Sequence, residues 1–307
     1  MSIAFKEIEK IAKELGFAAV GYAPAAQLTD EPERYLQALE SGHFASLEYL
    51  KRNLEKRFNP QLLVEGARSV LVFLAPYGQQ VTSEFVEITQ APENSHPLPD
   101  SYKVAQYALG EDYHTVIRGK LNVILQMMKE RNPQISGRAF VDTAPVLERA
   151  WAVRAGLGFI GKNNFFISRE HGIRNFIGVI ISSYAIDEIE AKKEEECGGY
   201  EKNLSGREEE IGKKFCGSCT KCIESCPTGA LCAPYTLDAR KCTSYLTIEE
   251  KGATIGLNME KAAERGGWIF GCDACMNACP WNSRNGKGWE EFEQKEQPLP
   301  ASHLHRR

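Results

Sequence analysis

The chain of 307 residues has no apolar run of the length that a membrane-spanning helix needs. Its first residues alternate charged and apolar side chains, as in a surface helix and unlike a secretion signal. Neither charge dominates, because 41 acidic and 37 basic residues give a formal net charge of -4. We therefore expect a cytoplasmic protein with no membrane partner, and any polyanion would have to bind a local basic patch.

Two nucleotide-binding signatures are also missing. The chain has no Walker A loop, and its literal G-x-G-x-x-G, at residues 156–161, follows a predicted helix and not a strand. A dinucleotide site needs that glycine-rich turn directly after a strand. The sequence therefore does not predict a familiar nucleotide cofactor.

Cysteine, in contrast, is plentiful, with 10 residues in the chain. Residues 216–227 have the spacing C-x2-C-x2-C-x3-C-P of bacterial ferredoxins, in which three thiolates bind one cubane and the fourth reaches a second. Residues 272–280 repeat the end of this pattern but are one cysteine short, and Cys242 could supply the missing thiolate. Two sets of four thiolates are what two 4Fe-4S clusters require.

Ferredoxin geometry predicts how these thiolates are shared. The first cluster would take Cys216, Cys219, Cys222 and Cys279, and the second Cys226, Cys242, Cys272 and Cys275. Structural zinc is an alternative, because C-x2-C pairs also build tetrahedral sites, but a dense run of four thiolates followed by proline fits zinc poorly. Disulfides are disfavoured without a secretion signal. Outside both patterns, we expect Cys197 to be an idle thiol and Cys232 a small buried side chain.

Before the cysteines, strand and helix patterns alternate. Helices are expected at 3–15, before Gly42, at 113–131 and from Pro145 to about 155, and strands at 17–22, 67–75, 138–142 and 176–184. Residues 67–75 are apolar throughout, as in a sheet covered on both faces. The pattern predicts a sheet-and-helix domain of the α/β or α+β class.

Composition suggests the domain boundaries. The expected parts are a catalytic domain at 1–185, a charged linker or insert at 186–214, a two-cluster ferredoxin-like domain at 215–285 and a loose tail at 286–307. The insert is rich in Glu and Lys and has few large apolar residues, which suits a solvated segment.

Asp142 is the most interesting residue of the first domain. It stands at the end of a predicted strand, where open α/β sheets place their ligand sites. A partly buried carboxyl there could have a raised pKa and donate a proton. The alternative is an N-cap, since Asp is common directly before a helix.

Eight motifs, in order along nearly the whole chain, resemble those of epoxyqueuosine reductases. They lie at 56–60, 66–70, 107–114, 141–152 (VDTAPVLERAWA), 155–164 (AGLGFIGKNN), 216–230, 240–248 and 271–282 (GCDACMNACPWN). That family uses cob(I/II)alamin, fed by two 4Fe-4S clusters, to reduce epoxyqueuosine to queuosine at the wobble position of tRNA, the last step of queuosine biosynthesis. The resemblance implies a monomer that holds cobalamin base-off and receives electrons from an external low-potential donor such as flavodoxin or ferredoxin.

The resemblance also implies roles for single residues. Asp142 matches the proton donor beside the corrin, and Lys251 matches a position that touches tRNA. The other matches to cofactor contacts are Arg57, Phe166, Ile177, Ser244, Cys272 and Asp273. Epoxide opening needs two electrons and a proton, so an acid near the opening oxygen agrees with this chemistry.

Some positions depart from expected patterns. Asp112 and His114 begin the D-x-H-x-x-G motif of other cobalamin enzymes, but Ile117 replaces its glycine, so we expect a structural or substrate-facing histidine. Val179 stands where the family has an acid. Candidate tRNA contacts besides Lys251 are Arg284, Lys287 and residues 305–307, with Tyr107 and Tyr113 lining a pocket for the base.

Two other functions stay open from the sequence. An electron-transfer protein, in which a two-cluster ferredoxin is fused to a docking domain, would need neither Asp142 nor a corrin site. A dehalogenase-like corrinoid and iron–sulfur reductase would act on a small molecule in place of tRNA.

Overall fold

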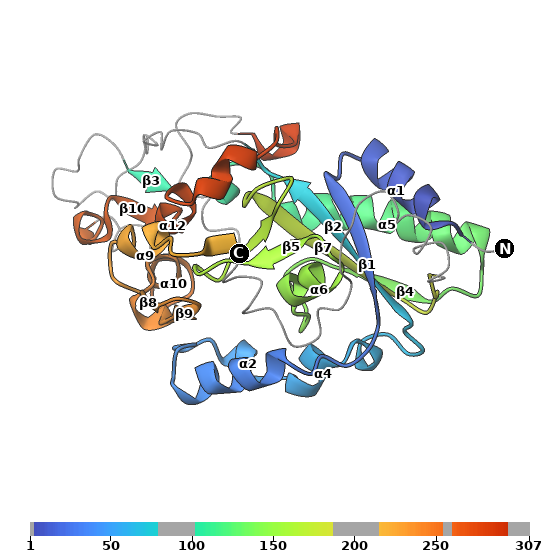
Figure 1. Cartoon of the computed structure of the whole chain (residues 1–307), viewed down its shortest axis with the longest axis horizontal. Coiled ribbons are helices and arrows are strands. Elements are labelled where there is room, and N and C mark those ends of the chain that lie inside the picture. The colour runs from blue at the N-terminus through green and yellow to red at the C-terminus, as the bar shows by residue number, and fades with distance from the viewer. Residues whose placement is uncertain (1–2, 79–101, 187–214, 254–259, 294–307) are drawn as a thin grey trace.

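A four-stranded sheet forms the centre of the structure, a computed structural model that describes residues 3–78, 102–186, 215–253 and 260–293 (Figure 1). The strands, in sheet order, are β1 (Ala19–Pro24), β2 (Ser69–Pro76), β7 (Asn175–Ser182) and β4 (Gly137–Phe140). All neighbouring pairs run antiparallel. The predicted mixture of strands and helices is therefore confirmed.

Strand β2 shows why a continuous apolar run is needed here. Its residues are all buried, and Leu71, Phe73 and Ala75 face one core while the residues between them face another. Successive side chains of a strand point to opposite faces of the sheet. Burial on both faces, as expected for 67–75, is thus confirmed.

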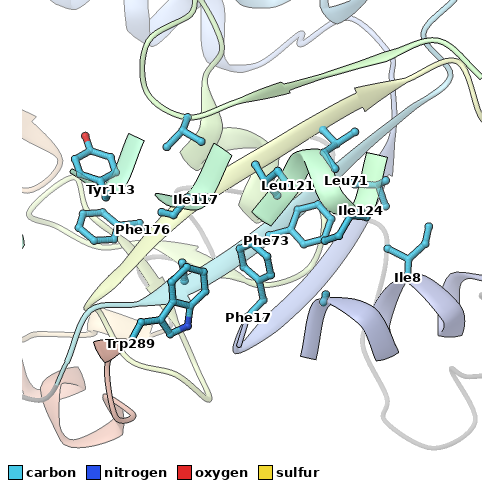
Figure 2. Packing of buried hydrophobic residues seen from close by; sticks show 14 of the residues in the cluster. Ile8, Phe17, Leu71, Phe73, Tyr113, Ile117, Leu121, Ile124, Phe176 and Trp289 are labelled. Atoms are coloured by element: carbon cyan, nitrogen blue, oxygen red, sulfur yellow. The ribbon is translucent and has the colours of Figure 1, made fainter. Parts of the chain in front are cut away.

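Helix α5 (Tyr113–Arg131) covers one face of the sheet, with α1 (Phe5–Glu14) beside it (Figure 1). Figure 2 shows Ile117, Leu121 and Ile124 of α5 beside Phe73 in this core. The Asp112 side chain caps α5 by accepting a hydrogen bond from the backbone N–H of His114 at 3.0 Å. The prediction of a helix at 113–131 is confirmed.

Helix α6 (Glu148–Arg154) covers the opposite face, and its Trp151 is 2% exposed. Two hydrogen bonds of 2.9 and 3.0 Å from Arg154 to Glu31 attach α2 (Glu31–Glu40) to it. Helices α3 (Glu48–Lys51) and α4 (Leu54–Phe58) follow α2. The expectation that Pro145 opens α6 is wrong, because tight turns, such as the one closed from Val146 N to the Ala144 carbonyl at 2.8 Å, precede the helix.

The G-x-G-x-x-G stretch lies in a hairpin of β5 (Gly158–Ile160) and β6 (Phe166–Ser168). A Cβ atom on Gly158 would stand 2.1 Å from the Ile167 carbonyl oxygen, and one on Gly161 would stand 2.6 Å from Ile167 Cδ1. These glycines therefore permit close contact between two strands. They do not form a dinucleotide turn.

The cysteine-rich part lies beside one end of the sheet (Figure 1). Its elements are α9 (Lys221–Glu224), β8 (Leu231–Ala233), β9 (Thr236–Leu237), α10 (Thr243–Ile248), β10 (Trp268–Phe270) and α12 (Ala274–Asn277). Strand β10 pairs in parallel with β3 (Lys103–Val104). A segment from the first half of the chain is thus built into the cysteine-rich part.

The chain then returns to the first domain. Trp289 and Phe292 are 7% and 5% exposed, and the Trp289 indole N–H donates to the Gly16 carbonyl at 2.6 Å. The expectation of a loose tail from residue 286 is therefore wrong up to residue 293, because these aromatic rings complete the core under α1. Residues 79–101, most of the expected insert and residues 294–307 lie outside the described residues.

Within the ranges that the structure describes, no helix combines the length and the apolar composition of a membrane span.

Candidate active site

Each of the two cysteine runs has one of its cysteines in a short helix. Cys222 lies in α9 and Cys275 in α12, and the two helices are in contact. The Ser225 hydroxyl donates to the Ala274 carbonyl at 3.3 Å. The internal repeat of the sequence thus forms a pair of facing loops.

The thiols of these loops fall into two electrostatic groups. Burial first, and then the neighbouring Cys216, Cys222 and Cys219, raise the pKa of Cys279 to about 11. Burial likewise raises the pKa of Cys272 to about 12, and its cysteine neighbours are Cys242 and Cys226. Burial raises the pKa of the Cys275 thiol well above its ordinary value. The charges of Cys272 and Cys242 contribute next, ahead of those of Cys222 and Cys226.

A mononuclear zinc site needs Cys, His or carboxylate ligands that converge on one point. Among the described residues, no three or more His, Cys, Asp or Glu side chains converge in that way. The thiolates of a cubane bind different iron atoms, so they surround a larger volume. Cys232 is exposed, so the expectation that it is a buried side chain is wrong, and Cys197 lies outside the described residues.

Asp142 lies just after β4 and has a left-handed backbone, with φ of 53°. Its Oδ2 accepts a hydrogen bond from the Tyr113 hydroxyl at 2.6 Å and lies 3.9 Å from His114 Nε2. The side chain is 65% exposed, in contrast to the partly buried setting that the sequence suggested. Because α6 begins at Glu148 with Leu147 at its N-cap position, Asp142 does not cap it.

Glu148 holds the backbone of Asp142. Its Oε1 accepts a hydrogen bond from the Asp142 N–H at 3.0 Å. Burial, and next the negative charge of Asp142, raise the pKa of Glu148 to about 8. Near neutral pH the protonated Glu148 carboxyl therefore holds the backbone of the exposed Asp142. The sequence did not predict this contact, because it depends on the turns before α6.

His114 lies between two carboxylates. Its Nδ1 is 2.7 Å from Asp112 Oδ1, and its other ring nitrogen faces Asp142. The Tyr113 ring is buried and stacks on Phe176 with centroids 4.2 Å apart. Tyr113 therefore presents its hydroxyl to Asp142 and keeps its ring in the core.

Tyr49 lies beside Arg57, one of the expected cofactor contacts, and within electrostatic range of Asp142. The ring is 50% exposed, yet burial first, then the charges of Glu249 and Asp142, raise its pKa to about 12. The Arg57 guanidinium donates from Nη2 to the Tyr49 carbonyl at 2.8 Å. Charges from segments far apart in sequence thus act on Tyr49, which has no motif signal.

The remaining residues matched to cofactor contacts vary in exposure. Phe166 is 5% exposed in the core under α6, and Ile177 packs against that core from β7. Ser244 is half-buried in α10. Near it, the Thr247 hydroxyl accepts from the Gly271 N–H at 3.0 Å, which joins α10 to the residue before Cys272.

Asp273 forms a buried ion pair that the sequence did not predict. Its Oδ2 lies 3.3 Å from Arg174 Nη1, and the two side chains are 7% and 1% exposed. The same oxygen accepts from the Gln106 N–H at 2.9 Å, and Arg174 also donates to Asn277. Val179, which stands where the family has an acid, is fully buried in the core.

Of the expected tRNA contacts, Lys251, Arg284 and Lys287 are exposed, and Tyr107 is half-buried. The charge of Lys251 is one of those that lower the pKa of Glu48 in α3, after the hydrogen bond from Lys51. Lys251 therefore lies near α3, the helix that also carries Tyr49. Residues 305–307 lie outside the described residues.

Comparison with known proteins adds family information. The profile described as "Epoxyqueuosine reductase QueG, DUF1730" matches residues 57–143, and "4Fe-4S double cluster binding domain" matches residues 215–282. An epoxyqueuosine reductase of Leadbetterella byssophila is 36% identical over 278 residues, which cover 91% of this chain and 80% of the relative.

Two solved structures have the same fold over nearly the whole chain. One is a crystal structure of epoxyqueuosine reductase with an epoxyqueuosine-modified tRNA-Tyr stem loop, with a TM-score of 0.71 and 27% identity over 95% of this chain and 68% of that one. The other is a Bacillus subtilis epoxyqueuosine reductase whose aspartate-bearing catalytic loop is swung out of the active site. It has a TM-score of 0.70 and 26% identity, over 95% and 68% of the two chains.

Proposed function

Because the chain belongs to the epoxyqueuosine reductase family of oxidoreductases, we propose that it reduces epoxyqueuosine to queuosine in the anticodon loop of tRNA. The observation that carries this proposal is the position of Asp142, which is exposed to a substrate yet held by Tyr113 and Glu148. A relative is known with an aspartate-bearing catalytic loop. Asp142 is therefore our candidate general acid for the oxygen of the opening epoxide.

The cysteines would hold two clusters in the partition that the ferredoxin spacing predicts. The grouping of Cys279 with the first run, and of Cys272 with Cys242 and Cys226, supports this assignment. The match to a double-cluster domain supports the cofactor type. Electrons would enter from an external low-potential donor and pass one at a time toward the substrate side.

Two buried polar atoms support cobalamin as the cofactor. Arg57 Nε and Thr243 Oγ1 are buried polar atoms that have no hydrogen-bond partner within the described part of the chain, as expected beside a polar cofactor. Arg57 and Ser244, backbone atoms at Phe166 and Ile177, and the turn at Cys272 and Asp273 would hold it. When bound, cobalamin supplies the low-valent cobalt that reduces a strained carbon–oxygen bond.

The tRNA would approach from the side of Lys251 and Tyr49. A relative has been solved with a tRNA stem loop, which supports tRNA as the substrate. Exposed lysines and arginines bind phosphates, and such binding weakens as salt rises. The exposed Tyr49 ring is suited to stack on a base that is splayed out of the loop.

The direct test uses reconstituted protein with tRNA that carries epoxyqueuosine. Nucleoside analysis by mass spectrometry should show loss of epoxyqueuosine and formation of queuosine. Asp142→Asn should keep its iron and its bound corrin but turn over about 10²- to 10⁴-fold more slowly, the usual contribution of a general acid. Asp30→Asn, at an exposed aspartate before α2, is the matched control and should keep the wild-type rate.

Each alternative function has a different outcome. A protein that binds no corrin and leaves epoxyqueuosine intact would be an electron carrier. A protein that binds corrin but converts only small halogenated compounds would be a dehalogenase-like reductase. An unchanged rate in Asp142→Asn would remove Asp142 from the acid role while leaving the activity itself established.

A further inference from the structure

The turn between β5 and β6 touches both cysteine runs. Its Lys162 Nζ donates to the carbonyls of Gly217 and Cys219 at 2.6 and 3.0 Å. The next residue, Asn163, donates from its side chain to the Cys275 carbonyl at 3.5 Å. Lys162 and Asn163 are 8% and 4% exposed. This buried turn thus joins the first domain to both cysteine loops.

The Lys162 ammonium is unusual because its partners are neutral. Across the ranges that the structure describes, its hydrogen bonds go to backbone carbonyls and no carboxylate forms an ion pair with it. A buried charge is costly unless an opposite charge compensates it. A compensating negative charge is therefore expected close to the first cysteine run.

The first cluster has the required charge. A cubane held by four thiolates is an anion, and it gains a further negative charge when it is reduced. We propose that Lys162 is the charge partner of the first cluster, and that its ammonium positions the loop of Cys216 and Cys219 and raises the reduction potential of that cluster. This inference rests on the proposed ligand assignment and not on the identity of the substrate.

The second loop offers an internal comparison. Its contact from the same turn comes from the neutral Asn163, and its buried cation, Arg174, is already neutralised by Asp273. Among these buried contacts, the first loop therefore has one uncompensated positive charge and the second loop has none. Removing that charge should act on the first cluster and leave the second unchanged, because a nearby cation favours the more negative, reduced state.

The experiment is a redox titration of the reconstituted protein followed by electron paramagnetic resonance, with iron and sulfide measured per chain. Lys162→Gln keeps an N–H donor but removes the charge. It should lower the midpoint potential of the first cluster and leave that of the second cluster unchanged. Cys219→Ser identifies the signal of the first cluster. Lys162→Arg should restore the wild-type potential. Lys221→Met is the matched control, because this exposed lysine adjoins Cys222 but is screened by solvent.

Each remaining outcome decides the question. Full iron content with both potentials unchanged in Lys162→Gln would overturn the proposal, as would an equal shift in Lys221→Met. If Lys162→Gln loses iron, the proposal stands when Lys162→Arg loads both clusters and falls when arginine fails as well. Wild-type protein without clusters would instead overturn the ligand assignment, and it is detected before any variant is made.

Discussion

Glu148 makes the stability of this protein depend on pH in a direction opposite to that of most carboxyl groups. Burial and the charge of Asp142 raise its pKa to about 8, against an ordinary value of about 4.3 in the unfolded chain. The unfolded state therefore releases the proton first as pH rises. The contribution of Glu148 to the free energy of unfolding is complete below its unfolded pKa. It falls as pH rises between the two pKa values and has been lost above the folded pKa.

The size of the effect follows from the two pKa values. Each pH unit between them removes about 1.4 kcal/mol of unfolding free energy, so a rise from about pH 5 to about pH 8 removes at most about 4 kcal/mol. Glu148→Gln resembles the protonated acid and can still accept from the Asp142 N–H. It should match the wild type near pH 5 and be more stable near pH 8.

The assay compares urea unfolding of the two cluster-loaded proteins across this range, since their difference cancels the titrations that they share. Infrared difference spectra should show a protonated carboxyl near neutral pH that Glu148→Gln lacks. Glu65→Gln, at an exposed glutamate, should follow the wild type at every pH. Parallel curves for wild type and Glu148→Gln would show that Glu148 ionises normally and would refute the reasoning.

Three further changes test the packing and the metal ligands. Arg174→Met leaves a buried carboxylate unpaired and should cost about 3–5 kcal/mol in urea unfolding, a loss that replacement of both partners by apolar residues should largely remove. Leu121→Ala, in the core, should lower the free energy of unfolding by about 2–5 kcal/mol. Val123→Ala changes a residue of α5 that is 53% exposed, so its loss should be far smaller. Equal losses would contradict the packing in Figure 2. Cys275→Ser should lose the iron of one cluster by chemical analysis, while Cys232→Ser should keep the full content.

Local patterns predicted what depends on neighbours in sequence. The helix at 113–131 follows from its periodicity and from its Asp112 cap, and the cysteine spacing follows from cluster chemistry. Motif resemblance, supported by the family matches, singled out Asp142. These features are written into short stretches of the chain.

Contacts between distant segments could not be predicted in this way. Arg174 meets Asp273, and Lys162 meets the first cysteine run, only because the sheet domain and the cysteine-rich part fold against each other. The residues after 286 were predicted to be a tail because most of them are polar. Trp289 and Phe292, which anchor this segment in the core, are only two residues among them. A single sequence has no periodic signal for such pairs.

The contact of Trp289 with Gly16 has a consequence for how the protein is made. It joins residues 273 positions apart, and the loop that it closes contains both cysteine runs. Contacts between such distant residues form late, because closing a long loop costs entropy before the contact is gained. We therefore expect an interval during synthesis in which both cysteine runs have emerged but Trp289 has not yet packed under α1. Iron can be inserted in this interval, before the contact between Trp289 and Gly16 forms.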